Sequence, residues 1–440
     1  MEVLILNQAS PSNPTSQTNR TNTSNRSSRS NSSNQPGGLL SPTNRARKRS
    51  AMVSTARAGE LNRARLLKTL YAHGPLARPE LARLTGSTRA TIGQIVQPLI
   101  DDGVLEEHDP VASGARGGKP ARPVWFCEDG WPVAAVLLLP DGVQAALITA
   151  SGRIAALSRE KFTPRQGHHD VIVQRVTECL NDVMAKATSP IRGIGIAVGG
   201  MVDTQTGDVV RVDLAPGLNG LALGPAISRG TGIPAFVDLQ PRAQALGDLL
   251  FGAGRGEENL CSVYVGEGIG AGFILDGALH QGARGAGGEV GHAVVDLRGR
   301  LCSCGLLGCW ETVAATRWIR AEAELRGLGV AGALGIGTAW LAGRAQADPI
   351  AADLLAEYAQ NISIGIANIQ QTLGLGLFIV HGDPVGGGEP FRAAIENHVQ
   401  NRAFDHPGSP VRVVFAEPQD YATLRGAAIS VLFRSMHVAF

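Results

Sequence analysis

The sequence predicts an α/β chain of more than one domain, in which a small helical domain precedes a larger body of alternating strands and helices. The chain has 440 residues, too many for one ordinary domain, and 44% of them are hydrophobic, enough for a large core. Helical spacing of apolar residues gives way near Trp131 to short apolar runs that alternate with helical segments. Residues 1–127 hold 17 lysines and arginines against 8 acidic residues, whereas the remainder is acidic on balance. A basic front suggests a polyanion-binding module, or simply a basic tail.

The start of the chain is expected to be a disordered low-complexity tail over residues 1–55. Residues 7–50 are mostly Ser, Thr, Asn and Arg and cannot bury enough apolar surface to fold. Met52 would make a plausible alternative start, so residues 1–51 need not belong to the native protein. No apolar run approaches the length of a membrane span, and the first residues lack the features of a signal peptide, so we expect a cytoplasmic protein without membrane contact.

Residues 56–127 predict three helices followed by two short strands. The first helix follows from apolar residues at helical spacing between Leu61 and Leu70, and the second spans residues 78–84. The third runs from residue 88 to about 102, with Ser87 as its N-cap. Residues 104–105 and 124–126 predict strands, and the loop between them is basic and rich in glycine. This arrangement is typical of a winged helix-turn-helix DNA-binding domain.

The start of the third helix is the part that would enter the major groove. Arg89 can form bidentate bonds with guanine and Gln94 with adenine, so these two side chains would read sequence. Ser87 and Thr88 are expected to contact phosphate, and Thr91 lies in the same turn. In the wing, phosphates or the minor groove would be reached by Arg116, Lys119 and Arg122. A small protein-interaction module with a basic surface is the alternative, which the basic wing disfavours.

The body opens with three predicted strands over residues 133–139, 143–150 and 153–160, followed by a helix over residues 170–187. Another strand, residues 193–198, ends in Gly199-Gly200. Residues 261–265 and 271–275 repeat the strand-turn-strand opening, and helices follow from Trp310 onward. Two halves that each open with a meander indicate an internally duplicated α/β body.

One histidine and three crowded cysteines form a candidate metal site. One imidazole and three thiolates complete a tetrahedral ligand set for Zn²⁺, which leaves no open position for an activated water. We therefore expect one structural zinc ion per chain, and the alternative is a group of reduced buried cysteines near an unrelated histidine. The ligands would be His292, Cys302, Cys304 and Cys309.

The same segments resemble the ROK family of repressors, open reading frames and kinases. The resemblance is carried by residues 287–292 and 302–311, by the glycine-rich residues 266–274 and by the turn at residues 199–203. It implies an actin-like (ribonuclease H-like, duplicated) two-lobed sugar-kinase fold over residues 131–440. The lobes would be roughly residues 131–245 plus the C-terminal helix, and residues 246–424. The preceding winged helix marks the repressor branch, and family membership implies a homodimer or homotetramer.

The resemblance also implies a sugar site in the cleft between the lobes. Glu289, His292 and Glu311 would hold the sugar, with the turn at Gly199 and Gly200 nearby. Carboxylates accept hydrogen bonds from sugar hydroxyls, and a metal-bound imidazole has a defined orientation. Glu311 could instead cap the helix that follows it or form a salt bridge there.

The chain departs from the family where the kinases carry their catalytic Asn-Asp pair. Leu239 and Gln240 occupy these positions, and neither side chain can accept the proton of a sugar hydroxyl. Asp238 is the neighbouring residue on a strand, so its side chain should point the other way. The nucleotide loops at residues 138–143 and 380–384 also lack their expected glycine turns. No enzymatic activity is therefore expected.

These observations favour a DNA-binding transcriptional regulator, a repressor of sugar or carbohydrate metabolism genes, with a kinase-dead sensor domain. Its partners would be double-stranded, pseudo-palindromic operator DNA and a sugar or sugar-derived effector. A sugar kinase that retains phosphotransfer is one alternative. A constitutive DNA-binding protein whose ligand-free body only supplies dimerisation is another.

Overall fold

The computed structural model describes residues 55–110, 122–164, 168–329, 335–403, 410–417, 421–436 and 438, and the chain from Val53 onward forms one compact unit. The expected disordered tail lies outside the described residues, apart from its last residue, as do Arg116 and Lys119 of the expected wing. Among the helices that are described, none is both long and apolar enough to cross a lipid bilayer.

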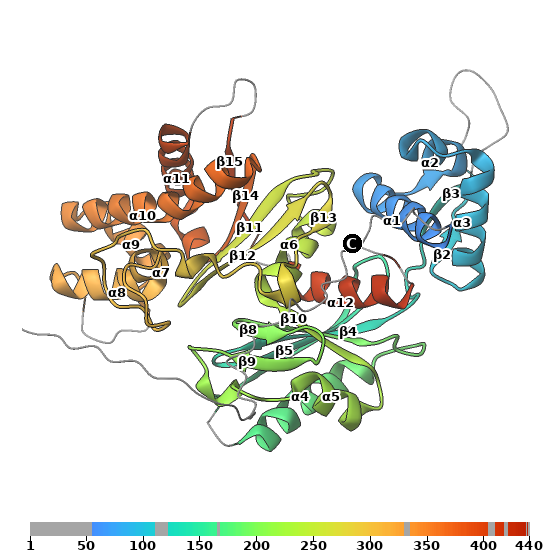
Figure 1. Ribbon diagram of the computed structural model, residues 1–440, viewed down its shortest axis with the longest axis horizontal. Coiled ribbons are helices and arrows are strands. Elements are labelled where there is room, and N and C mark those ends of the chain that lie inside the picture. Colours follow the sequence, from blue (N-terminus) through green and yellow to red (C-terminus); the bar gives the residue numbers. More distant parts are fainter. Residues whose placement is uncertain are drawn as a thin grey trace, which may run out of the picture. The chain divides into compact units, whose positions relative to one another are not determined.

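Three helices and a small sheet make up the front of the described chain (Figure 1). They are α1 (Thr55–His73), α2 (Arg78–Thr85) and α3 (Arg89–Asp101), with an antiparallel sheet in the order β1 (Leu76–Ala77), β3 (Pro123–Phe126), β2 (Leu105–Glu107). The three helices and two of the strands were predicted, whereas β1 has only two residues and is too short to show a pattern. The helices bury most of the apolar positions that predicted them, among them Leu67, Leu70, Ile92 and Val96, whereas Leu61 is exposed.

The N-cap of α3 is Thr88, and the prediction of Ser87 was wrong. The Thr88 hydroxyl accepts a hydrogen bond from the backbone N–H of Thr91 at 3.1 Å, which satisfies one of the free donors at the helix start. Ser87 instead closes the preceding turn, where its N–H donates to the carbonyl of Ala82. The helix therefore begins one residue later than predicted.

The first large sheet has five strands in the order β10-β7-β4-β5-β6. The first three strands along the chain pair antiparallel as a meander, while β7 lies parallel to β4, and β10 lies parallel to β7. The strands are β4 (Val133–Leu139), β5 (Gly142–Ile148), β6 (Ile154–Lys161), β7 (Ile194–Val198) and β10 (Ala235–Leu239). Two helices, α4 (His169–Met184) and α5 (Leu223–Thr231), pack on this part of the chain.

The second large sheet repeats this plan in the order β13-β12-β11-β14-β15. Again a meander of three antiparallel strands is extended on one side by two parallel strands. The strands are β11 (Leu260–Val265), β12 (Ile269–Leu275), β13 (Ala278–Leu279), β14 (Leu377–Gly382) and β15 (Arg412–Phe415). The shared strand order and pairing sense support the predicted internal duplication.

Several helices share a core with the second sheet. Trp318, Tyr358 and Ile395 contribute to this core from three different helices. The helices of this region are α7 (Glu311–Ala314), α8 (Thr316–Leu325), α9 (Thr338–Arg344), α10 (Pro349–Leu373) and α11 (Gly388–Arg402).

Two buried helices connect the halves of the body. They are α6 (Gln240–Phe251), which packs on β11 and β12, and α12 (Ala422–Ser435), which packs on β4 and β7; the two helices also pack on each other (Figure 1). Glycines allow their close approach. A Cβ on Gly247 would lie 1.9 Å from the carbonyl oxygen of Ala422, and one on Gly426 would lie 1.7 Å from that of Ala243. The backbones therefore touch where side chains would keep them apart.

Candidate functional site

The four predicted metal ligands lie together at the base of one loop. His292 ends a short 3-10 helix, and Cys302, Cys304 and Cys309 come from the loop that returns to α7. A backbone bridge between Val294 and Cys309 closes this loop. The turn requires a glycine at position 308, because a Cβ there would lie 1.5 Å from the carbonyl oxygen of Asp296 and the backbone has φ of +70°.

The donor atoms have the spacing of a tetrahedral site. All four lie within 4.8 Å of one another. The Sγ atoms of Cys304 and Cys309 are 3.6 Å apart, and Nδ1 of His292 is 3.6 Å from Sγ of Cys302. Tetrahedral zinc with ordinary bond lengths separates two sulfurs by about 3.8 Å and a sulfur from a nitrogen by about 3.6 Å. The two donor pairs with known distances therefore match a tetrahedral zinc site, and the residues present could hold such an ion.

Two of the three thiols resist ionisation in the absence of a cation, whereas the pKa of Cys304 is lowered, because its desolvation is outweighed by hydrogen bonds from the backbone of Leu306 and from the other two cysteines. Desolvation, followed by hydrogen bonds and charges from the other two cysteines, raises the pKa of Cys309 to about 12, and desolvation also raises the pKa of Cys302. Three thiolates this close would repel one another, whereas a divalent cation would hold all three in ionised form. The donor set therefore favours a metal-loaded state.

Two carboxylates adjoin the metal cluster. Glu311 is the first residue of α7 and is only 5% exposed. Its Oε1 accepts hydrogen bonds from Cys302 Sγ at 3.2 Å and from the Arg317 guanidinium at 2.7 Å, and it lies 3.9 Å from Nδ1 of His292. Burial raises the pKa of Glu289, and the charge of nearby Glu311 adds to this effect while His292 opposes it. The structure thus brings Glu289, His292 and Glu311 together. It also contains the salt bridge that was the alternative role of Glu311.

The glycine turn and the Leu239-Gln240 pair lie at the ends of two neighbouring strands. Gly199 follows β7 and Leu239 ends β10, and these strands are parallel neighbours, so their carboxyl ends meet. A Cβ on Gly199 would lie 3.0 Å from Oε1 of Gln240, and one on Gly288 would lie 3.2 Å from Leu239. The pair therefore lies between the glycine turn and the segment that carries Glu289, which is the place of the expected sugar site.

Arg242 is a residue that the sequence reasoning missed. Its side chain is fully buried in α6 and donates hydrogen bonds to the carboxylate of Asp238, at 2.7 Å from Nε, and to the carbonyl oxygens of Gly285 and Gly287. The spacing of four residues between Asp238 and Arg242, across the junction of strand and helix, is the signal that was available. The ion pair engages the Asp238 carboxylate and fixes the segment that precedes Glu289.

Acidic side chains lie near residues 138–143 and 380–384, the two segments at the positions of the family's nucleotide loops. Burial raises the pKa of Tyr264, and the charges of Glu267, Asp141 and Asp383 raise it further, which places all three carboxylates near one phenol. Glu267 is paired with Arg320, and Asp383 accepts a hydrogen bond from the N–H of Thr338 at 2.9 Å. Phosphate sites normally present backbone N–H groups and cations instead. Of these three carboxylates, Glu267 is therefore offset by the Arg320 guanidinium, and Asp383 is engaged by Thr338.

The predicted DNA-contacting residues lie at the start of α3 and on the small sheet. Arg89 and Gln94 are exposed, and Ser87 and Thr91 are half-buried beside them. The hydroxyls of Thr88 and Thr91 are 2.9 Å apart and bonded, so the capping interaction already engages both. Arg122, the one described wing residue, is exposed and lies 3.8 Å from the carboxylate of Glu107.

Comparisons with known proteins define the class of this chain. The model of the ROK family matches residues 140–433, two thirds of the sequence, and the chain belongs to this family. Its relatives include both repressors and kinases. The chain is 26% identical over 390 residues to the putative xylose repressor of Caldicellulosiruptor sp. (strain Rt8B.4), an alignment that covers 85% of this chain and 96% of the relative.

Solved structures of the family share the fold. A ROK family transcriptional regulator, a homolog of the E. coli Mlc protein, superposes with a TM-score of 0.71 and 26% identity, over 86% of this chain and 98% of that one. A ROK family glucokinase from Streptomyces griseus, solved with glucose and AMPPNP, gives a TM-score of 0.59 and 26% identity over 68% of this chain and 98% of its own. The superposition with the regulator covers 86% of this chain and so includes part of its front, whereas the superposition with the glucokinase covers 68% of this chain.

Proposed function

We propose that this protein is a DNA-binding transcriptional repressor of sugar metabolism genes. Residues 56–127 would form its winged helix-turn-helix domain, and residues 131–440 its actin-like, two-lobed sensor domain. The observation that carries the proposal is α3, which presents exposed Arg89 and Gln94 directly after its capped start. Such a helix can enter the major groove and read base edges. The near full-length similarity to a repressor supports the same reading.

The body would act as a sensor without transferring phosphate. Leu239 and Gln240 supply no general base, and the carboxylate of Asp238 is held by Arg242. The carboxylates of Asp141 and Asp383, which lie in the segments at the positions of the nucleotide loops, would disfavour the phosphates of a nucleotide. A sugar-type effector would contact the carboxylates of Glu289 and Glu311, close to the turn at Gly199 and Gly200.

A structural zinc ion would support this sensor site. His292 faces Cys302 with Nδ1, so a metal bound to that atom leaves Nε2 as an N–H donor for the effector. The ion supplies only a fixed geometry, because its four protein ligands fill the coordination sphere. Zinc binding would therefore order both the imidazole and the start of α7, where Glu311 lies.

The protein would bind a pseudo-palindromic operator as a homodimer or homotetramer. Effector binding would change the distance between two copies of α3, and therefore the affinity for the operator. The test is a gel-shift titration of the full chain with DNA fragments from its own genome at low salt. Arg89→Ala should weaken binding at least tenfold, since a bidentate base contact contributes about 1–3 kcal/mol. Arg229→Ala, an exposed arginine on α5, is the matched control.

Two further measurements separate this proposal from its alternatives. A coupled assay for ADP release over a panel of sugars including xylose and glucose should show no turnover, and clear turnover would favour a retained kinase. Adding the same sugars to the gel-shift reaction should change operator affinity. If operator binding is intact but insensitive to every sugar, and calorimetry detects no sugar binding, the constitutive DNA-binding alternative is favoured. A failure of the chain to bind any fragment would refute the proposal.

A further inference from the structure

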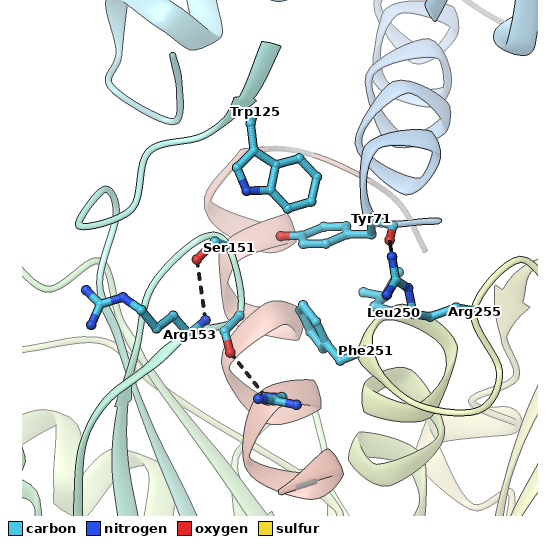
Figure 2. A pocket seen from close by; sticks show the side chains of 9 residues that line it. Tyr71, Trp125, Ser151, Arg153, Leu250, Phe251 and Arg255 are labelled. Carbon is cyan, nitrogen blue, oxygen red and sulfur yellow. Dashed lines mark hydrogen bonds between the residues drawn. The ribbon is translucent and has the colours of Figure 1, made fainter. Parts of the chain in front are cut away.

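A second candidate binding site shares no residue with the metal cluster. A pocket of about 330 Å³ is enclosed by the end of α1, strand β3, the turn between β5 and β6, the end of α6 and the start of α12. Figure 2 shows the rings of Tyr71, Trp125 and Phe251 and the guanidinium of Arg255 around it, while the Arg153 side chain points away from the rings. Its volume is in the usual range for small-molecule sites.

The aromatic wall of this pocket is held in place on several sides. The Tyr71 ring stacks on Phe126 with centroids 4.3 Å apart and meets Phe251 edge-on at 5.2 Å. Its hydroxyl donates to the carbonyl oxygen of Ala150, and burial raises the pKa of this phenol well above its usual value. Gly152, with φ of +83°, lies directly against Phe251, since a Cβ there would be 2.1 Å from the ring. The wall is therefore preorganised for a flat apolar group.

The pocket is also positively charged. Three arginines line it, and no acidic side chain does. Arg153 is paired with Asp129, which lies outside the lining, and Arg425 sits 5.6 Å from the Phe251 ring centre while its Nε donates to the carbonyl of Gly152. Arg255 donates to the carbonyl oxygens of Tyr71 and Ala72 and forms no ion pair within the part of the chain described here. A guanidinium has five N–H donors, so Arg255 retains donors for a ligand.

We propose that this pocket binds a small organic acid with a flat ring, such as an aromatic carboxylate. The carboxylate would be bound by Arg255, because a guanidinium pairs with a carboxylate through two parallel hydrogen bonds. The ring would pack against Trp125 and Phe251, which are only partly buried, while the buried Tyr71 ring supports Phe251 from behind. This site is separate from the residues of the proposed sugar site, so it would give the protein a second effector of different chemistry.

The proposal is tested by isothermal titration of the full chain with benzoate. Binding is expected in the micromolar to millimolar range, as is usual for a ligand of so few atoms. Benzyl alcohol, which has the ring without the charge, and acetate, which has the charge without the ring, should both bind at least tenfold more weakly. The intrinsic fluorescence of the protein should change on saturation, because Trp125 lines the pocket.

Substitutions at two positions test whether benzoate binds in this pocket. Arg255→Gln should weaken benzoate binding at least tenfold, while Arg255→Lys, which keeps the charge, should retain part of the affinity. Ser151→Glu places a negative charge at the edge of the pocket without removing an arginine, and it should also reduce binding at least tenfold. Arg229→Gln on α5 is the matched control and should bind as the unaltered chain does.

Three results would overturn the proposal. The first is absence of benzoate binding at millimolar concentration, and the second is equal binding of benzyl alcohol. The third is benzoate binding that is unchanged in both Arg255→Gln and Ser151→Glu. Because the titration needs no DNA and no sugar, its failure would leave the proposed repressor function unaffected.

Discussion

Single residues decide the chemistry that this body can perform. The carboxyl ends of β7 and β10 place Gln240 next to Gly199, where a proton acceptor would be needed for phosphate transfer. An amide is nearly the same size as a carboxylate, yet it cannot take up a proton at neutral pH. Together with Leu239, Gln240 would therefore leave this position without a general base while α6 stays packed.

Restoring the carboxylate alone should not restore a kinase. Gln240→Asp is expected to give no ADP release with any sugar, because Leu239 still offers no hydrogen bond and the segments 138–143 and 380–384 still lack the glycine turns of a nucleotide site. The coupled assay with saturating ATP provides the measurement, and the S. griseus ROK glucokinase serves as positive control. Turnover by this variant would show that the nucleotide site is intact.

The metal ligands allow a second prediction at this scale. Cys309→Ser should abolish the one equivalent of bound zinc measured by elemental analysis and should lower the thermal transition. Zinc retention by the unaltered chain should weaken as the pH falls, since binding must displace protons from three thiols, one of which has a pKa of about 12 without metal. Cys179→Ser, at a buried cysteine of α4, provides the control and should keep its zinc. Full zinc content in Cys309→Ser would contradict the assigned ligand set.

The ligands of the metal site could be predicted because they lie within eighteen residues and their chemistry is specific. The carboxylates followed only from the family resemblance, since nothing in their spacing indicates that Glu289 and Glu311 converge. Arg242 was missed because its partners include the carbonyl oxygens of Gly285 and Gly287, and backbone acceptors leave no trace in a sequence. Contacts of this kind become visible only when the fold is known.

Secondary-structure elements were predicted well where periodicity extends over several turns or pairs. The helix α3, the three strands of the first meander and two strands of the second, β11 and β12, were found within a few residues of their ends, whereas α1 begins before the predicted pattern at Leu61 and β13 was not predicted. Strand β1 was not found, because two residues cannot show alternation. The N-cap of α3 was assigned one residue early, since Ser87 and Thr88 have equivalent capping chemistry and only the geometry distinguishes them.

The contact of α6 with α12 provides a prediction at the level of elements. Gly426→Ala should lower the free energy of unfolding by about 1–3 kcal/mol, because the added methyl group forces two backbones apart. Gly343→Ala is the matched control: it lies on an exposed face of α9 with nothing within 4 Å of the added Cβ, and it should stabilise the chain by up to about 1 kcal/mol. Denaturant unfolding measures both. If Gly426→Ala changes the free energy of unfolding no differently from Gly343→Ala, the close contact of α6 with α12 does not contribute to stability.

At the scale of the whole unit, α6 spans the distance between two functional regions. Its first residue lies at the proposed sugar site, and its last residue, Phe251, meets the ring of Tyr71 at the end of α1. The residues from Gln240 to Leu250 are all buried, so the helix is confined along its length. A displacement of α6 at the proposed sugar site would therefore also move its other end, at Tyr71.

Removing the Phe251 ring should uncouple the front helices from the body. Phe251→Ala is expected to lower stability on the order of 2 kcal/mol, less than for a fully buried ring, and to split the calorimetric transition into two. The lower transition would correspond to residues 55–126. Phe162→Ala, a half-buried ring packed against the first sheet, is the control and should shift the transition without splitting it. A single sharp transition in Phe251→Ala would show that the remaining contacts of α1 are enough to couple the front helices to the body.

The position of α12 has a consequence for synthesis of the chain. This helix is the last described element, yet it packs against β4 and β7, which lie more than two hundred residues earlier in the chain. Until α12 has been synthesised, the face of the first sheet that includes Val133 and Ala197 lacks the helix that covers it. The nascent protein must therefore expose an apolar β-surface until residues 422–435 have been synthesised, so truncation before residue 422 should yield aggregated product.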